Sequence, residues 1–148
     1  MKTFVVLFSL LALTNAVSRE FVENFMNKLQ EVGEKCAEET NATDDDVAAL
    51  IAHTMPESHN GKCMILCFNV AFHLQKPDGT PDKEGSIASL EPLKADDPEM
   101  HAKVLKIFMT CGQKTAVDAD PCMTAAHLAE CATLEGKAAG LSADMFEV

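Results

Sequence analysis

The chain has 148 residues, and its 23 aspartates and glutamates outnumber its 12 lysines and arginines, which gives a formal net charge of −11. So acidic a chain repels nucleic acid and anionic membranes, and it has no tryptophan, no tyrosine and no basic run with interleaved aromatic residues. We therefore discount nucleic-acid binding. The length is sufficient for a single domain with a hydrophobic core, and we find no internal repeat or domain linker.

The first 18 residues have the pattern of a secretory signal peptide. Lys2 supplies the positive start, and the apolar run over residues 4–13 is too short to span a bilayer. Small side chains allow cleavage after Ala16 or after Ser18. The alternative is a membrane anchor or a buried helix. We expect a secreted protein in which residues 19–148 form the domain.

Six cysteines follow the signal peptide, and an even number in a secreted chain implies three disulfides in an oxidising compartment. Cys63 and Cys67 are one helical turn apart and point the same way, so we expect them to bond to two different partners rather than to each other. The six residues are Cys36, Cys63, Cys67, Cys111, Cys122 and Cys131.

Three helices are predicted in the first half of the domain. Apolar residues recur at helical spacing over residues 19–40, with polar residues on the opposite side. A second helix begins after Thr43, whose hydroxyl can cap it, and Pro56 ends it near Thr54. A third helix covers about residues 60–74, with its apolar side chains on one face.

The second half contains a long connection and two further helices. Residues 75–97 are rich in proline and glycine, which predicts either a plain connector or a lid, with a short helical turn over about residues 82–90. Pro98 suits the first turn of a helix that ends at Gly112. The last helix is capped by Asp120 and runs to about residue 135. Its alanines keep it slim, so we expect it in the middle of the packing.

The sequence lacks the groups that an enzyme would need. No serine or cysteine nucleophile has a recognisable motif around it, and no glycine-rich phosphate loop is present. His59 and His73 are too few to complete a metal site with nearby cysteines. The acidic triplet 44–46 lacks the spacing of a calcium loop and suits a helix start. We expect a non-enzymatic protein without a cofactor or a metal.

A surplus of adaptable apolar side chains remains, since the chain has eight phenylalanines and eight methionines. Methionine fits irregular shapes and is common on surfaces that bind varied apolar partners. These residues can simply fill a solid core. Disulfides, which contribute roughly 2–4 kcal/mol each, can instead hold short helices around a cavity that an unbridged core would close.

The cysteine spacing is the most specific feature of the sequence. Between successive cysteines lie 26, 3, 43, 10 and 8 residues, so that the pattern contains Cys63-x3-Cys67 and Cys122-x8-Cys131. Together with the signal peptide and the helical periodicity, this spacing resembles the six-cysteine insect odorant-binding proteins, the pheromone and general odorant-binding family. The resemblance covers the whole mature chain.

The resemblance implies an all-α fold, a six-helix, disulfide-bridged single domain that encloses an apolar ligand cavity. It also implies one disulfide pairing out of the fifteen that six cysteines allow: Cys36–Cys67, Cys63–Cys122 and Cys111–Cys131. Members of the family carry small hydrophobic ligands (odorants, pheromones or fatty compounds) through fluids such as sensillar lymph. Candidate partners are therefore such a ligand and a membrane receptor, and the protein is expected as a monomer or a homodimer.

The expected ligand-binding residues are apolar and come from every predicted helix except the last, with one residue of the C-terminal tail near the mouth of the cavity. They are Phe25, Leu29, Leu50, Met64, Phe68, Ile87, Leu90, Val104, Ile107, Phe108 and Phe146.

Three further interpretations stay open on the sequence alone. The apolar tail over residues 141–148 contains acidic residues, which suits a lid that responds to pH, although a frayed terminus is the simpler alternative. Asn41 begins a glycosylation sequon. A solid-core structural or defence protein and a small secreted enzyme or inhibitor are the alternative functions, and displacement of an apolar fluorescent probe would separate them from a carrier.

Overall fold

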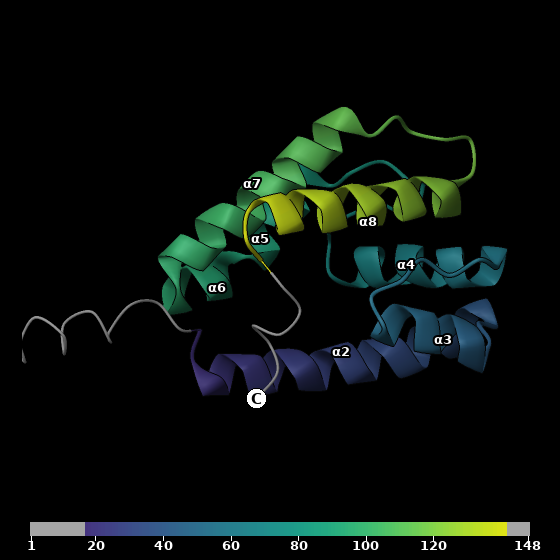
Figure 1. The fold of residues 1–148 in the computed structure, drawn as a ribbon, viewed down its shortest axis with the longest axis horizontal. Coiled ribbons are helices and arrows are strands. Elements are labelled where there is room, and N and C mark those ends of the chain that lie inside the picture. The colour runs from purple at the N-terminus through teal and green to yellow at the C-terminus, as the bar shows by residue number, and fades with distance from the viewer. Residues whose placement is uncertain (1–16, 142–148) are drawn as a thin grey trace, which may run out of the picture.

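The computed structural model describes residues 17–141, and this part of the chain is helical throughout, apart from turns, connections and one isolated bridge between Gln75 and Pro81. The all-α fold class is therefore confirmed. Residues 1–16 of the predicted signal peptide and residues 142–148 of the C-terminal tail lie outside the described residues. The helices are α2 (Arg19–Thr40), α3 (Asp44–Ile51), α4 (His59–Ala71), α5 (Lys83–Ser89), α6 (Glu91–Asp96), α7 (Pro98–Lys114) and α8 (Pro121–Ala138) (Figure 1).

Helices α4 and α8 form the centre of the packing. They share the most extensive contact in the molecule, and α2 packs on another side of α4 while α7 packs on α8. The short helices α5 and α6 lie against α7, and α3 lies against α4. Figure 1 shows α2 on one side of the molecule and α7 and α8 on the other. The central position expected for the slim last helix is confirmed.

Side-chain caps explain where most of these helices begin. The Asp120 carboxylate accepts a hydrogen bond from the Cys122 backbone N–H, which starts α8. Asp97 caps α7 in the same way, and Pro98 occupies the first helical position. Ser58 caps α4 through the Gly61 N–H. The caps predicted at Thr43 and Asp120 are confirmed.

A buried aspartate joins the beginnings of α3 and α4. Asp46 is 4 % exposed, and its carboxylate accepts hydrogen bonds from the Thr43 backbone N–H at 2.9 Å and from the Ser58 hydroxyl at 2.7 Å. These bonds hold the pKa of Asp46 below its ordinary value of 3.8, the Thr43 backbone bond contributing most. Gly61 is required beside this cluster, because a Cβ there would lie 2.5 Å from Pro56 Cβ and 2.7 Å from Asp46 Oδ1.

Three disulfides cross-link the four long helices, α2, α4, α7 and α8, in series. They link Cys36 of α2 to Cys67 of α4, Cys63 of α4 to Cys122 of α8, and Cys111 of α7 to Cys131 of α8. Cys63 and Cys67 bond to different helices, as their spacing predicts. The pairing is the one that the family resemblance implied.

The connection between α4 and α7 is more ordered than the sequence predicts. One helical turn is expected over about residues 82–90, whereas the structure has α5 and then α6, with only Leu90 between them. Pro92 contributed to the prediction of a loop here. It lies instead in the first turn of α6, where proline leaves no hydrogen bond unmade. The buried Gln75 side chain holds the start of the connection, donating to the Gly79 carbonyl and accepting from Asn69.

Other helix ends differ from the expected ones by a few residues. The second and third helices end at Ile51 and Ala71, about three residues early, and His53 and His73 follow these ends with positive φ angles of 56° and 57°. In contrast, α7 continues past Gly112 to Lys114. Glycine ended this helix in the sequence interpretation, but Gly112 has ordinary helical geometry, so the chain continues through it.

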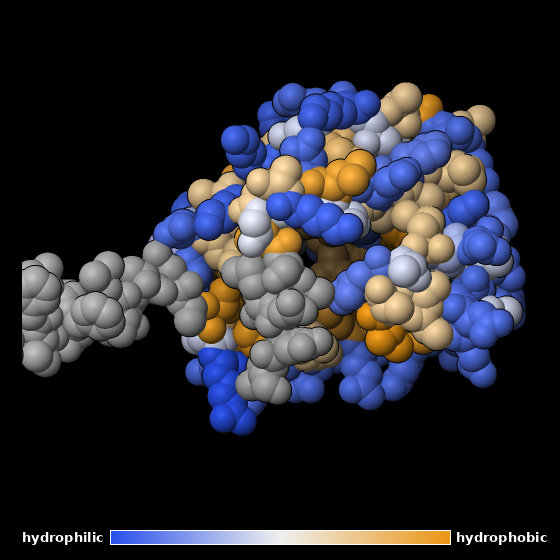
Figure 2. All heavy atoms as spheres, viewed as in Figure 1, coloured by the Kyte–Doolittle hydropathy of each residue, from blue (hydrophilic) through white to orange (hydrophobic). Residues whose placement is uncertain are grey.

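The core is compact around α8 and open elsewhere. Thr124 and Ala125 are fully buried and Ala126 is nearly so, because their small side chains let neighbouring helices approach closely. Many larger apolar side chains of α2, α4 and α7 are instead only half-buried. Figure 2 shows that the surface is hollowed near the centre of the molecule, with apolar residues around the opening. We call this feature the central hollow.

Candidate functional site

Aromatic side chains from the apolar face of α2 and from the end of α4 form one part of the candidate site. Phe21 and Phe25 are stacked with ring centroids 6.3 Å apart, and Phe25 lies 6.0 Å from Phe72, just past the end of α4. Phe72 in turn stacks on Phe68 at 6.4 Å. We call these four residues the aromatic cluster. Each ring is half-buried, so the cluster packs against itself while still offering apolar surface.

The cluster arises from local sequence on both helices. Phe21 and Phe25 are four residues apart on α2, and Phe68 and Phe72 have the same spacing at the end of α4, so each pair shares one helical face. Gly33 lets α2 approach α4 here, because a Cβ at this position would lie 3.3 Å from Phe68 Cζ. The Cys36–Cys67 disulfide then fixes the two helices next to this contact.

The structure brings some of the predicted ligand-binding residues together and separates others. Phe25 and Phe68 belong to the aromatic cluster, and Leu29, Leu50, Leu90 and Val104 are half-buried. Two residues are buried in the core, Met64 at 2 % and Ile107 at 8 % exposure, whereas Ile87 is 39 % exposed. Phe108 lines a pocket between α7 and α8. Phe146 lies outside the described residues.

Two members of the aromatic cluster were missing from the sequence prediction. Phe21 has the right periodicity on α2 and was assigned only to the apolar face of that helix. Phe72 lies within the third predicted helix, over about residues 60–74, but was not placed on its apolar face. The helix ends at Ala71, and Phe72, whose backbone N–H still bonds to the Phe68 carbonyl, contacts Phe25. The i, i+4 spacing from Phe68 was the signal that could have found it.

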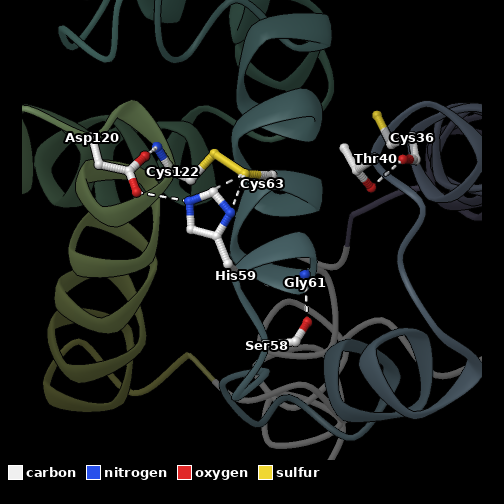
Figure 3. The surroundings of a disulfide bond; sticks show 8 residues. All are labelled: Cys36, Thr40, Ser58, His59, Gly61, Cys63, Asp120 and Cys122. Atoms are coloured by element: carbon white, nitrogen blue, oxygen red, sulfur yellow. Dashed lines mark hydrogen bonds and ion pairs between the residues drawn. A yellow bond between two sulfur atoms is a disulfide. The ribbon is translucent and has the colours of Figure 1, made fainter.

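A hydrogen bond between a histidine and an aspartate joins α4 to the start of α8, next to a disulfide (Figure 3). The His59 Nε2–H donates to Asp120 Oδ2 at 2.7 Å, next to the Cys63–Cys122 bridge. This bond and the Cys122 backbone N–H hold the pKa of Asp120 below its ordinary value of 3.8. Both groups are partly open to solvent, so the pair adds orientation at the helix start rather than a buried charge.

The same region contains the one grouping of potential metal ligands among residues 17–141. Atoms of His59, Cys63 and Cys122 lie within 4.8 Å of one another. A cysteine binds metal as a thiolate, and both sulfurs here are consumed in the disulfide. His59 alone remains, and it already pairs with Asp120. The donor set therefore does not fit a metal ion.

Asn41, the first residue of the glycosylation sequon, is exposed at the end of α2 with a left-handed φ of 52°. Its glycosylation stays a prediction.

No helix within the described residues is both long enough and apolar enough to cross a membrane.

An all-helical domain with three disulfides, half-buried apolar rings and a central hollow has the architecture of a carrier for small apolar molecules. Comparison with known proteins agrees with this class. The model of the PBP/GOBP family matches residues 18–134. The chain therefore belongs to the PBP/GOBP family, and it is a carrier that binds small apolar ligands. This family consists of non-enzymatic carriers.

Two curated relatives come from Drosophila melanogaster and are similar over nearly the whole chain. General odorant-binding protein 19d is 27 % identical over 139 residues, which cover 94 % of this chain and 92 % of the relative. General odorant-binding protein 28a is 29 % identical over 140 residues, covering 94 % and 97 %. Among solved structures, the odorant-binding protein dmelOBP28a of the same species matches with a TM-score of 0.69 at 26 % identity, covering 82 % of this chain and 99 % of that one.

Proposed function

We propose that the protein is secreted and carries a small volatile or lipid-like molecule in the central hollow, with the aromatic cluster as one wall. The observation that carries this proposal is the half-burial of large apolar side chains on helices that face one another. A solid core would bury these rings fully, since each buried apolar side chain contributes roughly 1.5–3 kcal/mol. The remaining apolar surface is available to a ligand.

The proposed wall includes the aromatic cluster and the half-buried apolar residues of α2, α3 and α7. Binding is then mainly apolar burial, which gains about 25 cal/mol for each Å² removed from water before the costs of association. Such binding discriminates weakly between ligands of similar size. The named odorant-binding activity of the relatives supports volatile ligands as the class.

A single tryptophan on α2 tests the site. The chain has no tryptophan and no tyrosine, so Leu29→Trp introduces the only strong fluorophore, one turn after Phe25. We expect blue-shifted emission, because the indole enters an apolar space, and weaker binding of an apolar extrinsic probe that small volatiles displace from the wild-type protein. Gln30→Trp, on the exposed side of the same helix, is the matched control. Unchanged affinity in Leu29→Trp, with native circular dichroism, would place the ligand elsewhere.

We also propose that the mature chain begins at Val17 rather than at Arg19. The Ser18 hydroxyl caps α2 by accepting from the Phe21 N–H at 3.2 Å, and the Ser18 backbone N–H donates to Asp96 Oδ2 at 2.7 Å. The Ser18 hydroxyl also donates to Asp96, so this residue ties the start of α2 to α6. Cleavage after Ser18 would remove both functions. The intact mass of protein recovered from insect-cell medium distinguishes the two starts, and protein that stays in the cells with its leader attached would contradict secretion.

A further inference from the structure

The Cys63–Cys122 disulfide differs from the bridge between α2 and α4 in the groups beside its sulfur atoms. The His59 ring lies against it, with Nδ1 3.6 Å and Nε2 3.9 Å from Cys63 Sγ (Figure 3). At the bridge between α2 and α4, the Glu39 carboxylate instead lies 3.6 Å from Cys67 Sγ. The first bridge therefore has an acid–base group beside it, whereas the second has a negative charge that repels an incoming thiolate.

Local sequence places a carboxylate and an imidazole around the Cys63–Cys122 bridge. His59 is the first residue of α4 and Cys63 follows four residues later, so both side chains lie on one face of the helix. Asp120 caps α8, and Cys122 is in its first turn. The carboxylate is shared, because Oδ1 accepts from the Cys122 backbone N–H at 2.9 Å and Oδ2 accepts from the His59 ring at 2.7 Å.

The Asp120 carboxylate determines which ring nitrogen of His59 is available for chemistry. A neutral imidazole has one N–H and one acceptor nitrogen. Since the Nε2–H donates to Asp120, the acceptor is Nδ1, which is the ring nitrogen nearer to Cys63 Sγ. A carboxylate in this position also stabilises the imidazolium that forms when Nδ1 takes up a proton. Asp120 is therefore a positioning residue, and His59 is a proton acceptor beside the sulfur.

Exposure selects which sulfur a small thiol can attack. The His59 side chain is 62 % exposed and Cys63 is half-buried, whereas Cys122 is 8 % exposed. The attack therefore falls on Cys63, and Cys122 is the leaving group. A thiolate on Cys122 lies in the first turn of α8, where the helix dipole and backbone N–H groups favour negative charge. A thiolate that is stabilised in this way leaves faster.

We propose that the Cys63–Cys122 bridge is a thiol-exchange site, at which a small thiol adds reversibly to Cys63. The S–H proton of the thiol passes to His59 Nδ1 as the thiol sulfur bonds to Cys63 Sγ. The bond between the two cysteine sulfurs breaks, and its electron pair stays on Cys122 as a thiolate. The thiol is the only co-reactant, and the imidazolium balances the charge of the thiolate. The reverse reaction expels the thiol and restores the bridge.

The fold provides for opening of this one bridge. Helices α4 and α8 share the most extensive contact in the molecule, so they stay packed without the bond. The other two disulfides still join α2 to α4 and α7 to α8. The exchange is therefore a local modification at the start of α8 rather than an unfolding reaction.

Brief exposure of the full mature protein to cysteamine tests the proposal. Its ammonium group suits an acidic chain, whose formal net charge is −11. N-ethylmaleimide then blocks the released thiol and the excess cysteamine, and peptide mapping locates both labels. We expect cysteamine on Cys63 and maleimide on Cys122, with the other two bridges intact. If another bridge opened first, or all three opened equally fast, the proposal would be overturned.

Two variants, each checked for native circular dichroism, test the roles of the imidazole and the carboxylate. His59→Gln should slow the exchange by at least about tenfold, since a positioned acid–base group contributes typically 10²–10⁴-fold. Asp120→Asn keeps a good helix cap but loses the charge, and it should also slow the exchange. His127→Gln, exposed on α8, is the matched control and should react like the wild type. Wild-type rates in both test variants would show that His59 takes no part.

The pH profile separates proton transfer from a merely structural role of His59. Unassisted attack has a rate constant per cysteamine thiolate that does not change with pH. Transfer of the thiol proton to a neutral imidazole is kinetically equivalent to thiolate attack beside an imidazolium. The rate constant per thiolate should therefore rise as the pH falls from about 8 to about 5, the range in which histidine changes charge. Asp120, the charged group in contact with His59, stays ionised there, because their hydrogen bond holds the pKa of Asp120 below 3.8. His59→Gln should give a flat profile, and a flat profile in the wild type would refute the proposed step.

Discussion

Three polar side chains fix the beginnings of two helices, α3 and α4. Asp46, Thr43 and Ser58 make one hydrogen-bonded cluster that begins α3 and α4. The sequence predicted the cap at Thr43 from residue type and position. It could not predict that Ser58, 12 residues after Asp46, would complete the cluster, because that contact depends on how the α3–α4 connection folds back.

The lowered pKa of Asp46 predicts how the cluster responds to acid. Its stabilising contribution is present above the unfolded value near 3.8 and is lost as pH falls through the lower folded value. Asp46→Asn should therefore lower the urea midpoint at neutral pH, and its difference from the wild type should shrink in acid, as the pH falls below 3.8 and through the lower folded pKa. Asp45→Asn, an exposed neighbour in the same helical turn, should have little effect at either pH. An equal difference at both pH values would show that the charge is irrelevant.

At the scale of helices, periodicity and caps predicted the long elements but not the short ones. The apolar stripe of α2 and the alanine-rich α8 are visible in the sequence because each repeats over several turns. Helix α6 has six residues, too few for a helical period to appear in the sequence. Its proline, Pro92, does not identify a helix, because proline also occurs in loops. Phe72 was missed although its backbone N–H bonds to the Phe68 carbonyl at the end of α4, so that its position follows from the i, i+4 spacing.

The slimness of α8 predicts a strong penalty for a larger side chain. Ala125 is completely buried on the helix that packs against both α4 and α7. Ala125→Leu should destabilise the protein by about 1–3 kcal/mol, because the surrounding core has no room for the added atoms. Ala138→Leu, exposed at the end of the same helix, should change the urea midpoint little. If the two variants were equally stable, α8 would not be the tight centre of the packing.

At the scale of the whole molecule, the disulfides compensate for the incomplete burial of the apolar side chains around the hollow. The bridges run from α2 through α4 and α8 to α7, so the bundle stays together although many apolar side chains are only half-buried. The resemblance to the odorant-binding family implied this arrangement as a class. The individual wall residues were harder to predict, because one helical face contributes both to the core, as Val22 does, and to the aromatic cluster, as Phe25 does.

Ligand binding in the central hollow and folding stability are linked, because the hollow exists only in the folded state. A ligand that binds only the folded state stabilises it by about 2.7 kcal/mol at a concentration one hundred times its Kd. For a domain of this size, that free energy should raise the Tm by about 10 °C. The measurement is a thermal unfolding series followed by circular dichroism over increasing concentrations of a displacing volatile. The wild type and Gln30→Trp should show the rise, and Leu29→Trp should show much less of it, since its indole already occupies the apolar space. A rise of equal size in all three proteins would mean that the stabilising ligand binds outside the central hollow.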